Sequence, residues 1–233
     1  RKSRKAVSQD EIAEAALALI DANGLEAFSI RNLAQALSVF PTALYWYFPA
    51  RIDILEAVAQ RVMAGITPPP SPDWRDWLTA FATALRGAIA RHPNCAPLIG
   101  GQLVSNSAAD LTMIEGLLAH LAKAGLQGPA LVQGYNLVMG SLVGFVTQEF
   151  ARPPEEGATP LRERILARME GIDPVAHPHL HRQAHAMLGH AFVLRWENGQ
   201  HQPMQDSFAL LVASLIAGIE RLAERPDPAI GGN

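Results

Sequence analysis

The strongest constraint on the fold is residues 29–48, which read as two short helices joined by a tight turn. Leu33 and Leu37 share one helical face, and Leu44 continues that face after the turn. Pro41 suits the first turn of the second helix, because its fixed φ is helical and its missing N–H would have no partner there. Such a pair either places its second helix in the major groove of DNA or forms an ordinary αα-hairpin in a bundle.

The DNA-binding interpretation assigns contacts with bases and phosphates to the second helix. The side chains that it makes available are Thr42, Ala43, Tyr45, Trp46 and Tyr47.

Amphipathic helices are expected on both sides of this pair. Residues 8–11 (Ser-Gln-Asp-Glu) form a capping box, and Val7 and Ile12 are placed as a hydrophobic staple. This first helix ends at Asn23-Gly24. Apolar residues at helical spacing predict another helix over residues 52–62.

The order of capped helix, helix pair and then Leu44-Tyr-x-x-Phe-Pro-x-Arg-x-x-x-Leu55 resembles the N-terminal domain of the TetR family of bacterial repressors. The family pattern there is close to Leu-Tyr-x-His-Phe-x-x-Lys-x-x-Leu-Leu. The resemblance implies DNA binding, with Arg51 in place of the phosphate-binding Lys and able to form a bidentate contact. The DNA-binding residues that we predict in addition to the five above are Ser29, Arg31, Phe40 and Arg51.

Two departures from the family have physical consequences. Ser38 occupies a turn position where the family has Gly, and a left-handed backbone there would cost about 1 kcal/mol. Phe40 replaces the usual Ser or Thr cap, whose loss typically costs about 1 kcal/mol. The Phe40 ring is expected either to touch DNA, for example at a thymine methyl, or to pack on the first helix.

Net charge by itself argues against nucleic acid. Residues 1–66 hold seven Lys/Arg and seven Asp/Glu, so the head is neutral, although the whole chain carries −3. The distribution favours DNA, because most acids lie on the first helix. A basic cluster at Arg1, Lys2, Arg4 and Lys5 is either an arm for the minor groove or a solubilising tail.

Composition predicts a helical protein of the cytoplasm. Hydrophobic residues make up 49% and aromatics only 6%, so the core is expected to be built from Ala, Leu, Val and Ile. The single Cys95 excludes an intrachain disulfide, as expected in a reducing compartment. We find no signal peptide and expect no run of about 18 apolar residues, hence no association with a membrane.

A proline-rich segment, residues 68–72, separates two domains. We place the DNA-binding domain at residues 6–66, with its motif at about 29–48, and a ligand-binding and dimerisation domain at 73–225. A mobile stretch is expected at 152–160. The helices predicted in the second domain are at about 73–91, 95–105, 108–124, 129–151, 175–197 and 204–225.

The second domain is similar to the regulatory half of the TetR family, in the branch that includes tetracycline repressors. The matching segments are Asp73-Trp-Arg, Arg91-His-Pro93, residues 144–149 and residues 208–220. The resemblance implies a ligand cavity and a homodimer joined by helices 129–151 and 204–225. Residues 206–224 are apolar almost all round and include small residues, which agrees with a buried interface, although a central helix in a monomer would read the same way.

The sequence constrains the identity of the ligand less than it constrains the fold. In an ungapped alignment the metal-holding histidines of tetracycline repressors fall on Ile99 and Gly140, so a tetracycline–magnesium complex is not expected and no cofactor is predicted. Each apolar candidate for the ligand site could instead be an ordinary core residue. Gln102 and Asn136 are favoured as ligand contacts, because an amide aimed inward needs a hydrogen-bond partner. The predicted ligand-binding residues are Phe81, Leu85, Gln102, Met113, Leu117, Asn136, Met139, Phe145 and Gln148.

A histidine cluster, residues 177–190, offers an alternative function. His181 and His185 stand one helical turn apart and could share zinc or nickel in a metal-sensing repressor, but polar groups on an exposed helix are the favoured interpretation. Cys95 lies near His92 without an orienting acid, so catalysis has little support.

The sequence therefore predicts an all-α protein with an N-terminal three-helix helix-turn-helix DNA-binding domain and a C-terminal helical ligand-binding and dimerisation domain. Its expected function is that of a ligand-responsive transcriptional regulator, most simply a repressor. It would bind a palindromic double-stranded DNA operator as a homodimer and be released by a small organic effector. The alternatives are a metal sensor and, in another class, an enzyme or carrier of apolar molecules.

Overall fold

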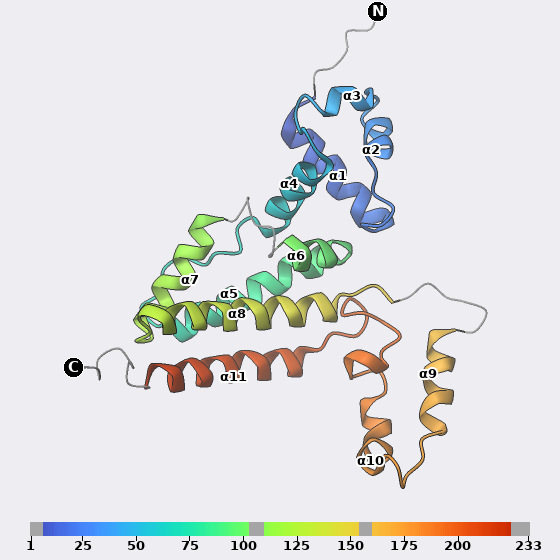
Figure 1. The fold of residues 1–233 in the computed structure, drawn as a ribbon, viewed down its shortest axis with the longest axis vertical. Helices are drawn as coiled ribbons and strands as arrows, with labels where there is room; N and C mark the ends of the chain where they lie inside the picture. Colours follow the sequence, from blue (N-terminus) through green and yellow to red (C-terminus); the bar gives the residue numbers. More distant parts are fainter. Residues whose placement is uncertain (1–6, 103–109, 154–159, 225–233) are drawn as a thin grey trace, which may run out of the picture.

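The structure is a computed structural model that describes residues 7–102, 110–153 and 160–224, without the Gln102 side chain. Within these ranges the chain is helical and contains no strand. The basic cluster at residues 1–5 and most of the stretch at 152–160 lie outside the described residues. Figure 1 shows a head made of α1 to α4 above a larger domain in which α8 and α11 run side by side. The helices are α1 (Gln9–Asn23), α2 (Ile30–Ala36), α3 (Pro41–Leu44), α4 (Arg51–Met63), α5 (Trp74–Arg91), α6 (Ala96–Gln102), α7 (Leu111–Lys123), α8 (Gly128–Glu149), α9 (Leu161–Glu170), α10 (Pro178–Met187) and α11 (Gln205–Ala223).

The first helix begins where the capping box predicts. The Ser8 hydroxyl accepts a hydrogen bond from the Glu11 backbone N–H, and the Glu11 carboxylate accepts one from the Ser8 backbone N–H. These two bonds satisfy donors that a helix N-terminus otherwise leaves without partners. The buried face of α1 packs against α2 and α4 around Leu33, Leu44 and Val58, all fully buried.

The helix pair α2 and α3 has the expected turn. Ser38 adopts φ of 55°, the left-handed region in which a glycine avoids the clash of a Cβ. Phe40 is the residue before α3 and provides no side-chain hydrogen bond to its first turn. α3 spans only four residues before the chain continues as turns through Tyr45–Tyr47, so the recognition helix is short.

The larger domain has its core between α5, α6, α7, α8 and α11. By length and composition alone, α8 is apolar enough to cross a membrane, which corrects the expectation that no such segment exists. α8 packs against all four of the other helices, and the core helix of a helical domain meets the same criterion.

Two differences from the predicted helices lie between α8 and α11. α9 was not expected, because it follows a Pro- and Gly-rich stretch and buries only Met169, so its apolar periodicity is weak. The single helix expected over 175–197 ends at Met187 instead. Gly189 has φ of 76°, which breaks the helix, and a short 3-10 turn follows at Phe192–Leu194.

One contact between the head and the larger domain lies at the last turn of α1, beside the packing of α4 on α5 and α6. His92 Nδ1 lies 2.8 Å from an Asp21 carboxylate oxygen, and the Asn94 side-chain amide donates to the Asp21 backbone carbonyl at 2.7 Å. Arg152, just after α8, donates to the Asn23 carbonyl at 3.3 Å. Donors from the larger domain thus satisfy carbonyls that the end of α1 leaves open, which ties the head to α5 and α8.

Candidate DNA-binding face and ligand groove

The predicted recognition segment presents large side chains to solvent. Trp46 is 88% exposed, Phe40 64% and Tyr45 48%. Thr42 is exposed as well, and Ala43 is half-buried. Most of the Phe40 surface is exposed in the single chain, and its contact with DNA stays a prediction. A short helix that displays aromatic rings this way has contact area available for a duplex.

Two of the three residues that flank the recognition segment in the predicted set, Ser29 and Arg51, have partners within the head. The Ser29 hydroxyl caps α2 by accepting from the Asn32 backbone N–H at 3.2 Å. The Arg51 guanidinium lies over the Phe28 ring, 5.4 Å from its centroid, and donates to the Phe28 carbonyl at 3.4 Å. Arg31 is exposed. Two cations therefore stand beside the recognition segment, one of them held in place by an aromatic ring.

Gln9 is a positioning residue that the sequence did not reveal. Its side-chain amide donates to the Tyr47 backbone carbonyl at 2.9 Å and so ties the first residue of α1 to the end of the recognition segment. Tyr47 itself is half-buried and packs on the core. Because Gln9 follows an ordinary helix cap, its spacing alone carries no signal for this contact.

Two acidic residues of α1 pair with an arginine of α4. Arg61 of α4 pairs with Asp10, and it also pairs with Glu14 at 3.4 Å. These pairs hold two acids of α1 beside a cation of α4.

The predicted ligand-binding residues separate into two groups. Five of them are buried in the core of the larger domain, namely Phe81, Leu85, Met113, Leu117 and Met139. Phe81 stacks on Trp77 with ring centroids 5.3 Å apart, and Trp77 stacks on the buried His120 at 4.3 Å.

Asn136 and Gln148 belong to the other group, because both lie on an exposed face of α8 within the single chain. Phe145 is half-buried and meets Phe208 and Phe192 at centroid distances of 5.6 and 5.3 Å. Gln102 ends α6, and its side chain is outside the described residues. The five buried residues come together, whereas the two exposed amides do not join them.

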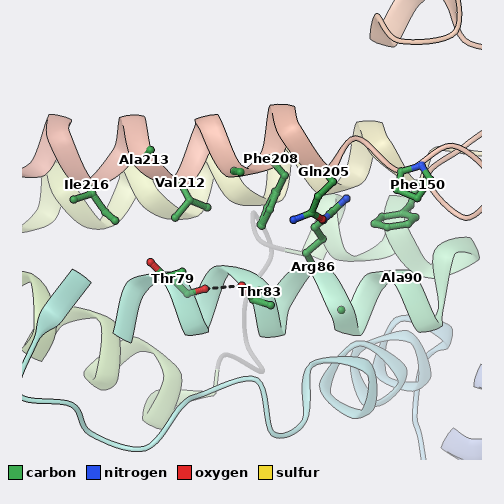
Figure 2. Close-up of a pocket in the computed structure, with 14 residues that line it drawn as sticks. Thr79, Thr83, Arg86, Ala90, Phe150, Gln205, Phe208, Val212, Ala213 and Ile216 are labelled. Atoms are coloured by element: carbon green, nitrogen blue, oxygen red, sulfur yellow. Dashed lines mark hydrogen bonds between the residues drawn. The ribbon is translucent and has the colours of Figure 1, made fainter. Parts of the chain in front are cut away.

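A separate groove of about 580 Å³ lies between α5 and α11. Figure 2 shows the two helices as its walls, with Thr79 and Thr83 on α5 facing Val212, Ala213 and Ile216 on α11. None of the nine predicted ligand-binding residues lines it. Arg86, Phe150, Gln205 and Phe208 line its other end.

A buried ion pair anchors that end of the groove. Glu149 is fully buried and accepts from Arg86 Nε at 2.8 Å, from Arg86 Nη2 at 2.6 Å and from the Met204 backbone N–H at 2.8 Å. The Arg86 guanidinium also lies 4.7 Å from the Phe208 ring centroid and donates to Gln205. Sequence reasoning placed Glu149 only within a family-like segment, because an isolated acid gives no signal of its partner 63 residues away.

The groups considered for metal binding or catalysis are not arranged for either role in the part of the chain that the structure describes. His177, His181 and His185 are exposed, and no group of three or more His, Cys, Asp or Glu side chains there could hold a metal ion. Burial, reinforced by the negative charge of Asp21, raises the pKa of the Cys95 thiol to about 12. A thiol nucleophile must be deprotonated, so Cys95 is inert at neutral pH.

Comparison with known proteins agrees with this geometry. Residues 12–58 match the model of bacterial regulatory proteins of the tetR family, and residues 67–222 match the tetracyclin repressor-like C-terminal domain. An HTH-type transcriptional regulator of Saccharopolyspora erythraea is 30% identical over 172 residues, which is 72% of each chain.

Solved structures share the fold. The ActR protein of Streptomyces coelicolor in complex with actinorhodin has a TM-score of 0.68 and 21% identity, covering 91% of this chain and 98% of ActR. BioQ with its double-stranded DNA operator has a TM-score of 0.62 and 22% identity, covering 91% and 99%. With a DNA-binding head and a regulatory domain that both match, the chain belongs to the TetR family of bacterial transcriptional regulators.

Proposed function

We propose that this regulator is a repressor that binds a palindromic operator as a homodimer and is released by a small organic effector. The observation that carries the proposal is the exposed recognition segment, in which Trp46, Phe40 and Tyr45 project from a helix pair whose other face is buried. TetR-family membership supports DNA binding, and BioQ, which has the same fold, is seen with its operator.

The nine predicted DNA-binding residues have separate roles in this proposal. Phe40, Thr42, Ala43, Tyr45 and Trp46 would reach base edges or the sugars beside them in the major groove. Ser29, Arg31, Tyr47 and Arg51 would contact phosphates, which position the head without reading sequence.

Dimerisation through α8 and α11 is supported by an apolar surface on these helices. Val132 is 57% exposed, Leu137 41% and Leu210 69%. Gly140 and Gly144 also lie on α8, and a Cβ on either would meet no atom within 4 Å in the single chain. An apolar surface with small residues is the kind of surface that a second copy covers.

The effector is proposed to bind within the regulatory domain, against the buried set of Phe81, Leu85, Met113, Leu117 and Met139, with Gln102, Asn136, Phe145 and Gln148 at its margins. ActR, which shares the fold, is seen with the small molecule actinorhodin. The contacts of Asp21 and Asn23 with His92, Asn94 and Arg152 give the effector a route to the head. An effector acts only through its differential affinity for the two states, and here it would favour a spacing of the heads that misses successive major grooves, about 34–36 Å apart.

The other functions considered lack a supporting observation. The exposed histidines do not favour a metal sensor, and the protonated Cys95 does not favour a thiol enzyme. We place the regulator in the cytoplasm, where the operator is accessible and a single thiol stays reduced.

Operator binding by head variants tests the proposal. Arg51→Gln and Tyr47→Phe are expected to weaken binding to all DNA sequences. Arg51→Gln should also lower the salt slope by about one for each phosphate that its guanidinium neutralises. Thr42→Val is expected instead to change preference at one base step. Fluorescence anisotropy with operator and scrambled duplexes at several salt concentrations measures these effects.

Arg91→Gln is the matched control, since it removes one exposed cation from the regulatory domain instead of the head. If Arg51→Gln and Arg91→Gln bind the operator equally well, with equal salt slopes, the proposed DNA-binding face is wrong.

A further inference from the structure

The groove between α5 and α11 is held open from both ends. At one end Arg75 of α5 pairs with Glu220 of α11, with Nε 2.8 Å from the carboxylate oxygen. At the other end Arg86 of α5 is bound to Glu149 and to Gln205, the first residue of α11. α5 and α11 are therefore antiparallel, and the two bridges lie about 16 Å apart along α5, since an α-helix rises 1.5 Å per residue.

Small side chains line the walls between these bridges. Between Arg75 and Arg86 the groove is lined by Thr79 and Thr83 on α5 and by Ala209, Val212 and Ala213 on α11. Helices with small residues facing each other normally approach closely, because little side-chain volume separates them. Here the polar bridges and the Phe208 ring keep them apart, so a slot of about 580 Å³ remains, within the size range of sites for small ligands.

The slot has no net charge. Arg86 is the only charged residue among the described residues that line it, and its guanidinium is neutralised by the buried Glu149. A charged ligand would have to lose its hydration without gaining an opposite charge. The slot therefore selects against ions.

Two threonine hydroxyl groups on the α5 wall are able to accept a hydrogen bond from a ligand. Thr79 donates to the Arg75 carbonyl and Thr83 to the Thr79 carbonyl, each at 2.8 Å. Because a hydroxyl has one hydrogen to donate and two lone pairs, both threonines face a ligand as acceptors. Phe208 and Phe150 add aromatic surface at the end near Arg86.

From these features we propose that the slot between α5 and α11 binds an uncharged, flat aromatic molecule of two or three rings that carries a hydroxyl donor. The rings lie between the Thr79/Thr83 wall of α5 and the Ala209/Ala213 wall of α11, and the hydroxyl donates to Thr79 or Thr83. This site is distinct from the proposed effector cavity and does not depend on operator binding.

Equilibrium dialysis of the full chain with three naphthalene probes tests the chemistry. 2-Naphthol is expected to bind saturably, with one molecule per chain. 2-Methoxynaphthalene, which lacks the donor, and 2-naphthoate, which is charged, are expected to bind more weakly. Replacing both acceptors in Thr79→Val/Thr83→Val should weaken 2-naphthol binding about fivefold, to the level of the ether, and leave binding of the ether unchanged.

Filling the slot tests its location. Ala213→Trp places an indole in the groove and should weaken 2-naphthol binding at least tenfold. Ala80→Trp is the matched control, because Ala80 is exposed on α5 but does not line the groove. Circular dichroism and sedimentation verify that both variants keep the fold and assembly of the parent.

Equal 2-naphthol affinity in Ala213→Trp and the parent protein would overturn the proposal, as would tighter binding of 2-naphthoate than of 2-naphthol. It would also be overturned if Ala213→Trp changed the oligomeric state while 2-naphthol binding stayed the same, since a second copy would then occupy the groove.

Discussion

The head and the regulatory domain each contain an arginine that pairs with an acid from a distant helix, in very different surroundings. In the head, Arg61 and Asp10 have side chains that are 33% and 79% exposed. In the regulatory domain, the side chains of Arg86 and Glu149 are 13% and 0% exposed. Water screens the first pair and is excluded from the second.

The difference in solvent exposure decides which of these charged residues can be replaced singly without a large loss of stability. An exposed pair contributes about 0–1 kcal/mol, because solvent already stabilises both charges. A buried pair contributes little over apolar packing, but removal of one partner leaves a charge in a low-dielectric interior. The head can therefore change its surface charges with little effect on folding, whereas at the junction of α5, α8 and α11 neither charge can be removed alone without a large cost.

Glu149→Gln is expected to give the largest effect. Loss of its charge leaves Arg86 buried without a counter-charge, at a cost of about 3–5 kcal/mol in the free energy of unfolding. Asp10→Asn removes an acid from the exposed pair and is expected to change the free energy by less than about 1 kcal/mol. Urea unfolding of both variants, followed by circular dichroism, measures the contrast.

A double variant sharpens this test. Arg86→Met combined with Glu149→Met removes both charges and should be more stable than Glu149→Gln, since no isolated charge remains. Equal stability losses for Asp10→Asn and Glu149→Gln would show that burial does not distinguish the two pairs.

Gly218→Leu extends the comparison to the proposed dimer surface. A Cβ at Gly218 would first meet Leu137 at 3.9 Å, an ordinary contact, so the single chain has room for a side chain. If α11 packs on a second copy, overpacking should cost about 1–3 kcal/mol per protomer, and the two-fold interface repeats it.

The Gly218→Leu variant should keep its helical circular dichroism, sediment as a monomer at micromolar concentration and lose operator affinity. Its control is Ala80→Leu, an equivalent enlargement on an exposed face of α5. A Gly218→Leu protein that remains dimeric would place the interface elsewhere.

Ser38→Gly is expected to have the smallest effect, and this effect should be confined to the head. Ser38 holds φ of 55°, and a glycine there would relieve a strain of about 1 kcal/mol. The loss of entropy on ordering a glycine offsets part of this gain. The midpoint of thermal unfolding should therefore rise slightly or stay level, and a clear fall would mean that the Ser38 side chain stabilises the turn.

Local features of the head could be predicted from sequence. The capping box at Ser8, the left-handed turn at Ser38 and the uncapped start at Phe40 depend on residues within four positions of one another. The helix at 161–170 was missed, because its local apolar pattern is too weak to distinguish it from the loop that precedes it. The prediction of one continuous helix over 175–197 was wrong, because the backbone takes a positive φ at Gly189 that the apolar spacing did not reveal.

By itself the sequence determined the all-helical class, the helix-turn-helix and the membership of a family, because periodicity, caps and motifs are local properties of the chain. Only the tertiary structure decided which distant groups meet. Gln9 reaches Tyr47 across 38 positions and Arg86 reaches Glu149 across 63, and the groove between α5 and α11 exists only because polar bridges at its two ends hold its walls apart. These contacts depend on how helices pack, and packing is set by the shape of the whole core rather than by any single segment.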